Sequence, residues 1–325
     1  MSNKGNQVKN IFYGPVFSRR FGYSLGIDLT PYKICSFDCI YCQLGKTTCK
    51  TTEIKRYTDI DYDNFKKDLL QIINSSSVID YITFAGSGEP TLSSDLKDLI
   101  KITKEITEIP VIVLTNGSGF SSDSVIDAVS VSNAVKISID ASDEISFKKI
   151  NKPHESITFD SFISGVKKFF NKYNGEIFIE TMLLKGLNDS DGSFENFKKL
   201  FKEIPFFYDK VKKIHLNNPF RLPESYGILK SSEGQTEKFM TLLPGKTEII
   251  KISKNHGTAL KHLHEEDLLL KIQEIIKRRP CTAKDISQSL NININESIKM
   301  LTYLINENKV YYNIKEAEKL FFLKR

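Results

Sequence analysis

Three cysteines near the start of the chain have the residue type and spacing to hold a metal cluster. Cys35, Cys39 and Cys42 follow one another in the pattern C-x3-C-x2-C. Iron–sulfur clusters are held by cysteine thiolates, and three thiolates this close in sequence can wrap one cluster. A four-iron cluster has four corners, so three protein ligands leave one iron open to a small molecule. The spacing therefore predicts a cluster that does chemistry rather than one that only stores electrons.

A structural zinc site is the alternative interpretation of these cysteines. Such a site closes four ligands around the metal, and the fourth ligand would be Cys49 or a histidine. The chain has only 5 cysteines in 325 residues, so three at this separation are not expected by chance. The spacing favours the iron–sulfur cluster.

Polar residues follow or line several segments that are predicted to be strands. The sequence Gly-Ser-Gly-Glu-Pro at 86–90 comes directly after a β-prone run at 81–85. Glycine lets a backbone approach a charged ligand closely, and a carboxylate or carbonyl can pair with an ammonium group. A tight turn whose acidic residue starts a helix is the plain structural alternative.

The next two predicted strands, 111–115 and 135–140, carry polar residues of the same kind. Asn116 ends the first, although an Asn-Gly pair also forms an ordinary turn. On the second, alternation places Lys136, Ser138 and Asp140 on one face and apolar residues on the other. Buried polar groups need partners, so these side chains indicate a polar cavity. Glu180, on a strand predicted at 177–184, is read either as a further inward group or as a surface carboxylate.

Strand-like and helix-like segments alternate along most of the chain, which predicts βα units and a mainly parallel sheet. Six such units are expected, with strands at 24–29, 81–85, 111–115, 135–140, 177–184 and 213–216 and helices at 61–74, 94–106, 159–171, 193–204 and 235–243. Three short helices follow, at 268–276, 282–290 and from Asn295, and then two strands at 310–313 and 320–323. Periodicity alone does not separate a barrel from an open, doubly wound sheet.

Cys35, Cys39, Tyr41 and Cys42 together resemble the signature of the radical S-adenosylmethionine (SAM) superfamily. The resemblance implies that the amino and carboxylate groups of SAM chelate the open iron. One electron from the cluster then cleaves SAM to methionine and a 5′-deoxyadenosyl radical, which abstracts hydrogen from a substrate. The resemblance also places Tyr41 near the adenine, although an aromatic residue at this position can equally be a packing residue of the loop.

The resemblance implies roles for the polar residues. It assigns the SAM amino group to the turn after the second strand, the SAM carboxylate to a lysine, and the ribose hydroxyls to a serine. Apart from the resemblance, Arg221 near the sixth strand can clamp the SAM carboxylate or an anionic substrate with two hydrogen bonds, or it can be a loop arginine in a surface ion pair. The cofactor-binding residues expected in all are Tyr41, Gly86, Ser87, Gly88, Glu89, Asn116, Lys136, Ser138 and Arg221.

The resemblance also implies the fold class, which is an α/β partial (β/α)6 barrel of the TIM type rather than a doubly wound sheet. A loss of periodicity at 251–264 predicts a linker between a core domain at 1–250 and a small C-terminal domain at 265–325. The three helices and two strands of that domain resemble a winged helix. That domain carries 11 Lys and Arg against 9 Asp and Glu. Strong duplex binding needs many phosphate contacts, so this charge favours a protein-contact or substrate-presenting module over a nucleic-acid module.

Segments 14–28, 35–45, 86–92 and 217–223 together resemble a poorly characterised radical SAM family that is grouped with the wybutosine-synthesis enzymes. Those enzymes rebuild a guanosine of tRNA and carry a second set of three widely spaced cysteines. Here only Cys49 and Cys281 remain. The departure argues against a second cluster and against that particular reaction.

Composition describes an ordinary globular protein, with 40% hydrophobic and 26% charged residues and a net charge of +6. The sequence predicts neither a membrane span nor a signal peptide. Few cysteines, in an odd number, fit a reducing compartment, so we expect a cytoplasmic protein. A reductant such as flavodoxin or ferredoxin is the partner that the resemblance implies.

Two classes of function are open at this point. The first is a radical SAM enzyme with a [4Fe–4S] cluster and SAM, acting on an RNA nucleoside or alternatively on a peptide or small metabolite. The second is a non-catalytic redox regulator that reads its cluster through the winged helix. The polar residues at the predicted strand ends favour the enzyme, because a redox sensor needs no SAM pocket.

Overall fold

A computed structural model gives the fold of this chain. The structure describes residues 11–18, 20–42, 44–76, 78–219, 229–241, 245–249, 265–290, 292, 294–315 and 318–324. No helix among these residues is long and apolar enough to cross a membrane.

An eight-stranded sheet forms the centre of the molecule, in the order β1-β2-β5-β6-β7-β8-β9-β10. All neighbouring strands are parallel except β1, which runs antiparallel to β2. The strands are β1 Phe12–Ser18, β2 Gly22–Ile27, β5 Tyr81–Phe84, β6 Val111–Thr115, β7 Ala134–Ser138, β8 Glu176–Met182, β9 Val211–Asn217 and β10 Thr247–Ile249. Because the strands from β2 to β9 are parallel, their C-terminal ends meet along one edge of the sheet, and the loops there build the site.

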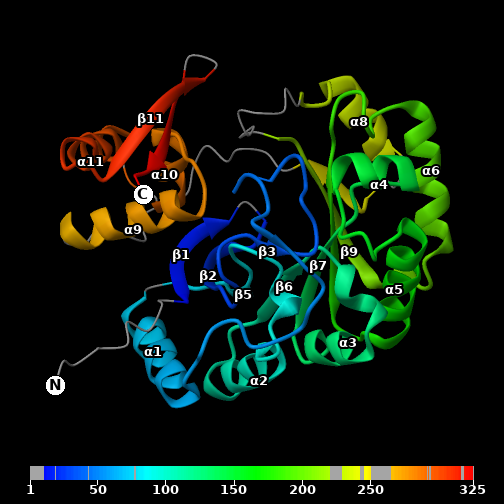
Figure 1. Ribbon diagram of the computed structural model, residues 1–325, viewed down its shortest axis with the longest axis horizontal. Coiled ribbons are helices and arrows are strands. Elements are labelled where there is room, and N and C mark those ends of the chain that lie inside the picture. Colours follow the sequence, from blue (N-terminus) through cyan, green and yellow to red (C-terminus); the bar gives the residue numbers. More distant parts are fainter. Residues whose placement is uncertain are drawn as a thin grey trace.

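Helices cover the outer face of the curved sheet, as Figure 1 shows for α2, α3, α5 and α6. The helices of this part are α1 Tyr62–Ser75, α2 Leu96–Ile106, α3 Asp123–Val129, α4 Glu144–Ile150, α5 Phe159–Lys172, α6 Asp191–Glu203, α7 Phe207–Lys210 and α8 Glu233–Thr241. Four of them begin at a side chain that accepts a bond from the first turn, namely Asp61, Asp143, Thr158 and Ser190. These caps satisfy backbone donors that a helix start leaves free.

The main core lies between the sheet and these helices. Val135, Ile137 and Ile139 are fully buried within it, on the face of β7 opposite to Lys136. Apolar and polar residues therefore alternate along this strand as the sequence predicts, with the apolar set packed under the helices.

The C-terminal part has its own core and packs against the first strand. It consists of α9 Glu265–Arg278, α10 Ala283–Leu290, α11 Ile294–Asn306 and the antiparallel pair β11 Val310–Lys315 and β12 Glu318–Leu323. Thr282 and Asp285 exchange backbone–side-chain hydrogen bonds at the start of α10, as their spacing predicts. Helices α9 and α10 contact β1 (Figure 1), and Val16 of that strand packs against the C-terminal core.

The predicted α/β class, the parallel sheet and the six βα-like units are confirmed. The first strand was placed at 24–29, whereas β2 runs from Gly22 to Ile27, because the tight β1–β2 connection starts pairing earlier. The antiparallel β1 was not predicted, nor were the two-residue strands β3 Ile34–Cys35 and β4 Cys49–Lys50. The linker expected at 251–264 lies outside the described residues.

Candidate active site

The loop with the three cysteines is held in place by backbone bonds at both ends. Strand β3 pairs with β4, so that Cys35 lies opposite Lys50. Farther along, Ile40 donates its backbone N–H to Ile150 O at 2.9 Å, and Cys42 donates its own to Cys39 O at 3.0 Å. The loop is therefore anchored to β4 on one side and to the end of α4 on the other.

Each of the three sulfurs meets an N–H donor from a different part of the chain. Lys33 Nζ lies 3.0 Å from the Cys42 sulfur. Asn116 Nδ2 lies 3.6 Å from the Cys35 sulfur, and Asn151 Nδ2 lies 3.5 Å from the Cys39 sulfur. Donors of this kind stabilise metal-bound thiolates and orient them.

The chemistry of these sulfurs fits an iron–sulfur cluster. Burial raises the pKa of Cys35 to about 12, and Glu89 adds to the rise. Burial likewise raises the pKa of Cys39 well above its usual value. A thiolate at either position thus needs a cation beside it, which cluster iron supplies. No three His, Cys, Asp or Glu side chains among the described residues are gathered as a site for a single metal ion. A four-iron cube spreads its ligands over different irons.

Lys33 is a buried cation against this loop. Its side chain reaches Cys42, and its backbone adopts the left-handed region, at φ 59°, where a residue with a side chain is strained. The backbone is held there because Lys33 N donates to Ser87 O at 2.7 Å and Lys33 O accepts from Cys49 N at 3.2 Å. Burial lowers the pKa of Lys33, but the neighbouring Cys42 outweighs it and raises the pKa overall. The lysine therefore remains an ammonium group.

Replacing Lys33 by methionine is expected to lower the midpoint potential of the bound cluster. Reduction adds negative charge to the cluster, and the ammonium at Cys42 stabilises that charge. Loss of one charge-assisted bond shifts a one-electron potential by on the order of 50 mV. A redox titration followed by electron paramagnetic resonance (EPR) measures the shift. Lys46→Met, at an exposed lysine of the same loop, is the control, and equal potentials in the two variants would contradict the role of Lys33.

The turn after β5 packs directly on the cysteine loop. A side chain at Gly86 would overlap the Asp28 carboxyl group, and one at Gly88 would overlap Ile34 O. Glu89 N donates to Ile34 O at 3.0 Å. Both glycines are thus required by close approach, and the predicted turn lies beside the predicted metal ligands.

Glu89 holds together three segments of the site. It is 2% exposed, and burial raises its pKa. One carboxylate oxygen accepts from the hydroxyls of Thr115 and Thr91, at 2.6 and 2.7 Å, and from Thr91 N. The other accepts from Asn116 N at 2.8 Å. The carboxylate therefore fixes the end of β6, and with it the amide of Asn116 that reaches Cys35.

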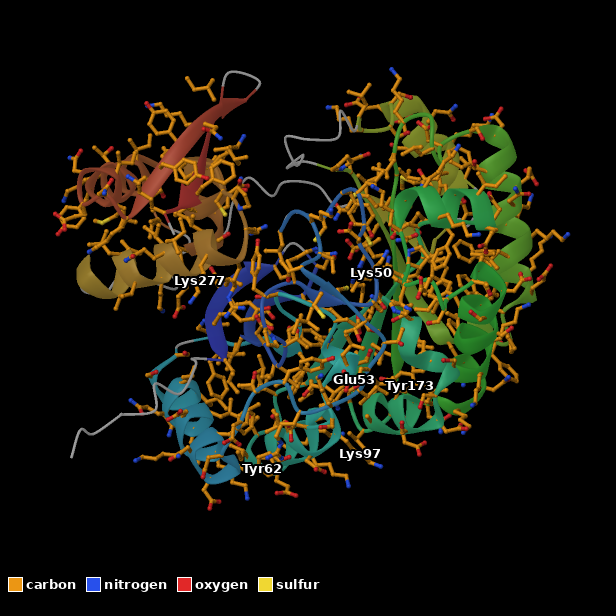
Figure 2. All side chains as sticks on the ribbon, viewed as in Figure 1. Lys50, Glu53, Tyr62, Lys97, Tyr173 and Lys277 are labelled. Carbon is orange, nitrogen blue, oxygen red and sulfur yellow. The ribbon has the colours of Figure 1, made fainter. Side chains whose placement is uncertain are left out.

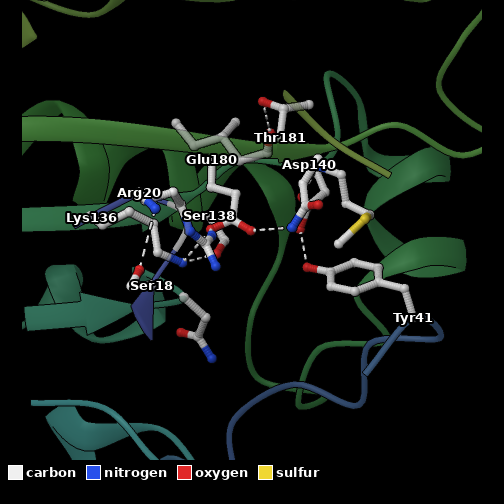
Figure 3. A network of polar contacts seen from close by, with 12 residues as sticks. Ser18, Arg20, Tyr41, Lys136, Ser138, Asp140, Glu180 and Thr181 are labelled. Atoms are coloured by element: carbon white, nitrogen blue, oxygen red, sulfur yellow. Dashed lines mark hydrogen bonds and ion pairs between the residues drawn. The ribbon is translucent and has the colours of Figure 1, made fainter. Parts of the chain in front are cut away.

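Inside the sheet, Glu180 of β8 joins two cations (Figure 3). Its carboxylate pairs with Arg20, from the β1–β2 connection, and with Lys136 Nζ at 3.1 Å. Asn217 Nδ2 donates to it at 2.9 Å. Burial alone would raise the pKa of Glu180, but Arg20 and Lys136 outweigh it and hold the pKa far below its usual range. Of the two readings of Glu180, the inward one is confirmed, since the residue is 8% exposed.

A second polar chain joins the cysteine loop to the end of β7. Asp140 accepts hydrogen bonds from the hydroxyl of Tyr41, from Asn151 Nδ2 at 2.9 Å and from Met182 N at 2.8 Å. Figure 3 shows the Tyr41 ring pointing at Asp140, next to the Glu180 pairs. Since Asn151 also donates to the Cys39 sulfur, this carboxylate orients both the loop and its aromatic residue.

His215 of β9 lies beside the Glu180 pairs and gives the fold a pH dependence. Its Nε2 lies 3.1 Å from Glu248 Oε1, and its ring stacks on Phe178. Burial lowers the pKa of His215 to about 4, with a further contribution from Arg20. A histidine in an unfolded chain has a pKa of about 6.5. The unfolded state therefore takes up the proton first, and the stability that His215 provides is lost as the pH falls from about 6.5 to about 4.

His215→Gln is expected to make the stability less sensitive to acid, because glutamine can still donate to Glu248 and does not titrate. As the pH is lowered from 7.5 to 5, the thermal unfolding midpoint of the native protein should decrease, and that of the variant should decrease less. An equal fall in both proteins would assign the acid sensitivity to other groups.

The structure places most of the expected cofactor-binding residues around one site. The turn at 86–89, Asn116, Lys136 and Ser138 lie at the C-terminal ends or inner face of β5, β6 and β7, and Lys136 Nζ donates to Ser138 Oγ at 3.2 Å. Tyr41 lies in the cysteine loop, and its hydroxyl donates to Asp140, which follows β7. Arg221 lies outside the described residues. Sequence reasoning missed Lys33, Asn151 and Arg20. Lys33 and Asn151 belong to no motif, although a lysine two residues before the first cysteine is a signal that could have been used. Arg20 lies in the segment 14–28, whose resemblance gave no role to single residues.

Comparison with known proteins decides the family. The sequence model described as the radical SAM superfamily matches residues 29–197. The chain belongs to the radical SAM superfamily. It is also 30% identical over 318 residues to "UPF0026 protein MJ1312" of Methanocaldococcus jannaschii, covering 97% of this chain and 96% of that protein. It thus belongs to the same family as that protein.

Other relatives carry names with different activities. A Brachyspira hyodysenteriae protein named "GTPase Obg" is 33% identical over 94% of this chain, which spans only 44% of that protein's length. A Buchnera aphidicola protein named "Dual-specificity RNA methyltransferase RlmN" is 24% identical over 69% of this chain and 61% of its own. These names do not agree on a substrate.

Membership establishes the protein as a radical SAM enzyme whose cofactors are a [4Fe–4S] cluster and SAM. This result sets aside the structural zinc site and the non-catalytic redox regulator. Enzymes of this superfamily require a reductant. Membership does not identify which residues bind these cofactors, nor the substrate.

Proposed function

We propose that Cys35, Cys39 and Cys42 hold the cluster and that SAM binds at its open iron, between the turn 86–89 and the end of β7. The observation that carries this proposal is the set of three N–H donors, from Lys33, Asn116 and Asn151, each within 3.6 Å of a different cysteine sulfur. One donor comes from the cysteine loop itself and two come from distant segments, and their convergence on three sulfurs supports a site built around thiolates.

When bound, the cluster and SAM supply a 5′-deoxyadenosyl radical by one-electron reductive cleavage. The chain's own residues position the reactants. The Gly86–Glu89 turn offers its backbone to the methionyl ammonium, and its glycines let that backbone pack closely against Asp28 and Ile34, beside the cysteine loop. Tyr41, oriented by Asp140, presents its ring to the adenine. Ser138 faces the ribose, and Arg221 is a candidate partner for a carboxylate.

Lys136 was expected to bind the SAM carboxylate, but its ion pair with Glu180 changes how it can do so. Its ammonium is paired with Glu180, which also pairs with Arg20, so the three side chains together carry one positive charge. This net charge supports the binding of an anionic group, from SAM or from the substrate. We propose that the net positive charge of the three side chains attracts this anionic group, and that Lys136 contributes to this charge while it stays paired with Glu180.

For the substrate we propose a nucleoside within RNA. Two carboxamide oxygens at the end of β9, Asn217 Oδ1 and Asn218 Oδ1, are buried and have no hydrogen-bond partner among the described residues. Such acceptors suit the N–H groups of a nucleobase. The relative named as an RNA methyltransferase and the resemblance to wybutosine enzymes agree with this choice.

The C-terminal part is proposed to be a winged-helix module, comprising residues 265–325, that presents the RNA to the core at 1–250. Its three helices and two-stranded hairpin support this assignment. On the hairpin, Tyr311 and Tyr312 are exposed, and Lys319 Nζ lies 4.3 Å from the Tyr312 ring centre. Exposed aromatic rings with lysines bind single-stranded nucleic acid by stacking and charge. We further propose a cytoplasmic location and flavodoxin or ferredoxin as the electron donor.

The test is an anaerobic reaction of the reconstituted enzyme with dithionite, SAM and RNA from a strain that lacks the gene. The proposal expects RNA to stimulate 5′-deoxyadenosine formation and one nucleoside to change mass on liquid chromatography–mass spectrometry. A matched peptide mixture should stimulate neither. If peptides stimulate the reaction and RNA does not, the substrate class is wrong, although the cofactor site stands.

A further inference from the structure

Arg278, the last residue of α9, connects the C-terminal part to the core. Its Nη1 lies 2.9 Å from Asp28 Oδ2, and its guanidinium carbon lies 3.6 Å from the centre of the Tyr13 ring. A guanidinium is planar, so one group can pair with a carboxylate and stack on an aromatic ring at the same time. The two side chains of the ion pair are 21% and 11% exposed, so solvent screens the pair only in part.

Both partners of Arg278 also bind the turn after β5. Asp28 Oδ2, the same oxygen that meets Arg278, accepts from Ser87 N at 3.0 Å and from Ser87 Oγ at 2.6 Å. The Tyr13 hydroxyl donates to Ala85 O at 3.1 Å. Two separate paths of direct contact therefore run from one arginine to the two ends of the Ala85–Ser87 segment.

The turn has little freedom to move independently of these partners. Gly86 lies so close to Asp28 that any side chain at position 86 would overlap the carboxyl group. On its other side, Ser87 O accepts from Lys33 N at 2.7 Å. A change in the position of Asp28 is therefore transmitted to the backbone that faces the cysteine loop.

We propose that Arg278 is a positioning residue through which the C-terminal part sets the geometry of the SAM-binding turn. This inference rests on the proposed role of Gly86–Glu89 in binding SAM. Without the arginine, the Asp28 carboxylate loses its cationic partner and Tyr13 loses its stacking partner, so neither residue holds the turn in one arrangement. SAM must then order the turn as it binds, and its affinity falls.

The coupling has a consequence for the C-terminal part as a whole. Coupling of two binding equilibria is reciprocal. If RNA binding to the C-terminal part stabilises the contact of Arg278 with Asp28 and Tyr13, RNA increases the affinity for SAM. SAM then increases the affinity for RNA by the same factor. The contact thus offers a route by which substrate binding prepares the cofactor site.

The experiment measures the dissociation constant of SAM for anaerobically reconstituted full-length protein, from the change that SAM makes in the EPR spectrum of the reduced cluster. Arg278→Met is expected to weaken SAM binding about tenfold, within the usual range of coupling between sites. Arg278→Lys, which keeps the charge and loses the planar group, should restore part of the affinity. Lys277→Met is the matched control, because Lys277 is exposed on the same turn of α9 (Figure 2), and it should bind SAM as the native protein does.

A readout apart from SAM binding separates positioning from simple stability. Amide hydrogen exchange at residues 85–89 should be faster in Arg278→Met than in Lys277→Met before SAM is added. If Arg278→Met does not fold, Tyr13→Phe tests the second path alone, since it removes the bond to Ala85 O and keeps the stacked ring. Tyr13→Phe should weaken SAM binding about threefold.

The possible outcomes are distinct. Native protein that keeps its cluster but does not bind SAM would overturn the proposed function of the site. Native protein that binds SAM, together with a folded Arg278→Met that binds it equally well and exchanges residues 85–89 at the native rate, would overturn the role of Arg278. If Arg278→Met does not fold, a Tyr13→Phe protein that binds SAM with native affinity would overturn the role of Arg278.

Discussion

Cys39→Ala is expected to abolish SAM cleavage. Its sulfur is partly buried, accepts a hydrogen bond from Asn151 and is one of only three proposed protein ligands, so its loss leaves two of four irons without a protein ligand. Cluster content after reconstitution, measured as iron and sulfide per chain, should fall sharply, and 5′-deoxyadenosine formation should fall at least about a hundredfold.

Cys49→Ala is the matched control for this experiment. Cys49 is exposed and lies opposite Ile34 in the β3–β4 pair, whereas Cys35 lies opposite Lys50. Because side chains alternate along a strand, Cys49 faces away from the side on which Cys35 lies. The control should keep its cluster and its activity. A Cys49→Ala protein that loses its cluster, beside a Cys39→Ala protein that keeps it, would contradict the assignment of the ligands.

Glu89→Ala is expected to have the largest effect on stability. The substitution leaves two backbone N–H groups, of Thr91 and Asn116, and two hydroxyls, of Thr91 and Thr115, without their acceptor at a site that is nearly closed to water. Each unsatisfied buried donor costs about 1–3 kcal/mol, and hydroxyls can partly rotate away, so the free energy of unfolding should fall by about 3–5 kcal/mol.

Urea unfolding of the cluster-free protein measures this effect without interference from the metal. Glu89→Gln keeps one acceptor oxygen and should lose less stability than Glu89→Ala. Glu53→Ala removes an exposed carboxylate (Figure 2) that pairs with Lys55 and should change little. If Glu89→Ala unfolds at the same urea concentration as Glu53→Ala, Glu89 does not hold the site together.

Local sequence patterns were sufficient for most of the fold. The apolar run Val111–Thr115 is strand β6 with the predicted bounds, and the periodic segment at 159–171 is α5, which extends one residue further. In both cases the apolar period, together with a capping residue or a following turn, determines the element. The short pieces β3, β4 and β10 have no such period, because they exist through pairing with distant strands.

The site was predictable where a motif lies in one stretch of sequence, as for the three cysteines and the turn 86–89. It was not predictable where a side chain acts through tertiary contact. Lys33 reaches Cys42 because its backbone is held in a strained conformation by Ser87 and Cys49. Lys136 was expected to be available to the SAM carboxylate, but it is paired with Glu180, which also pairs with Arg20 from the β1–β2 connection.

The central claim is that the three cysteines leave one iron of a [4Fe–4S] cluster open for SAM. The most direct test is the EPR spectrum of the anaerobically reconstituted, dithionite-reduced protein before and after SAM is added, with 5′-deoxyadenosine measured in the same sample. The account predicts a changed spectrum and formation of 5′-deoxyadenosine. An intact reduced cluster whose spectrum does not respond to SAM, with no 5′-deoxyadenosine formed, would contradict it.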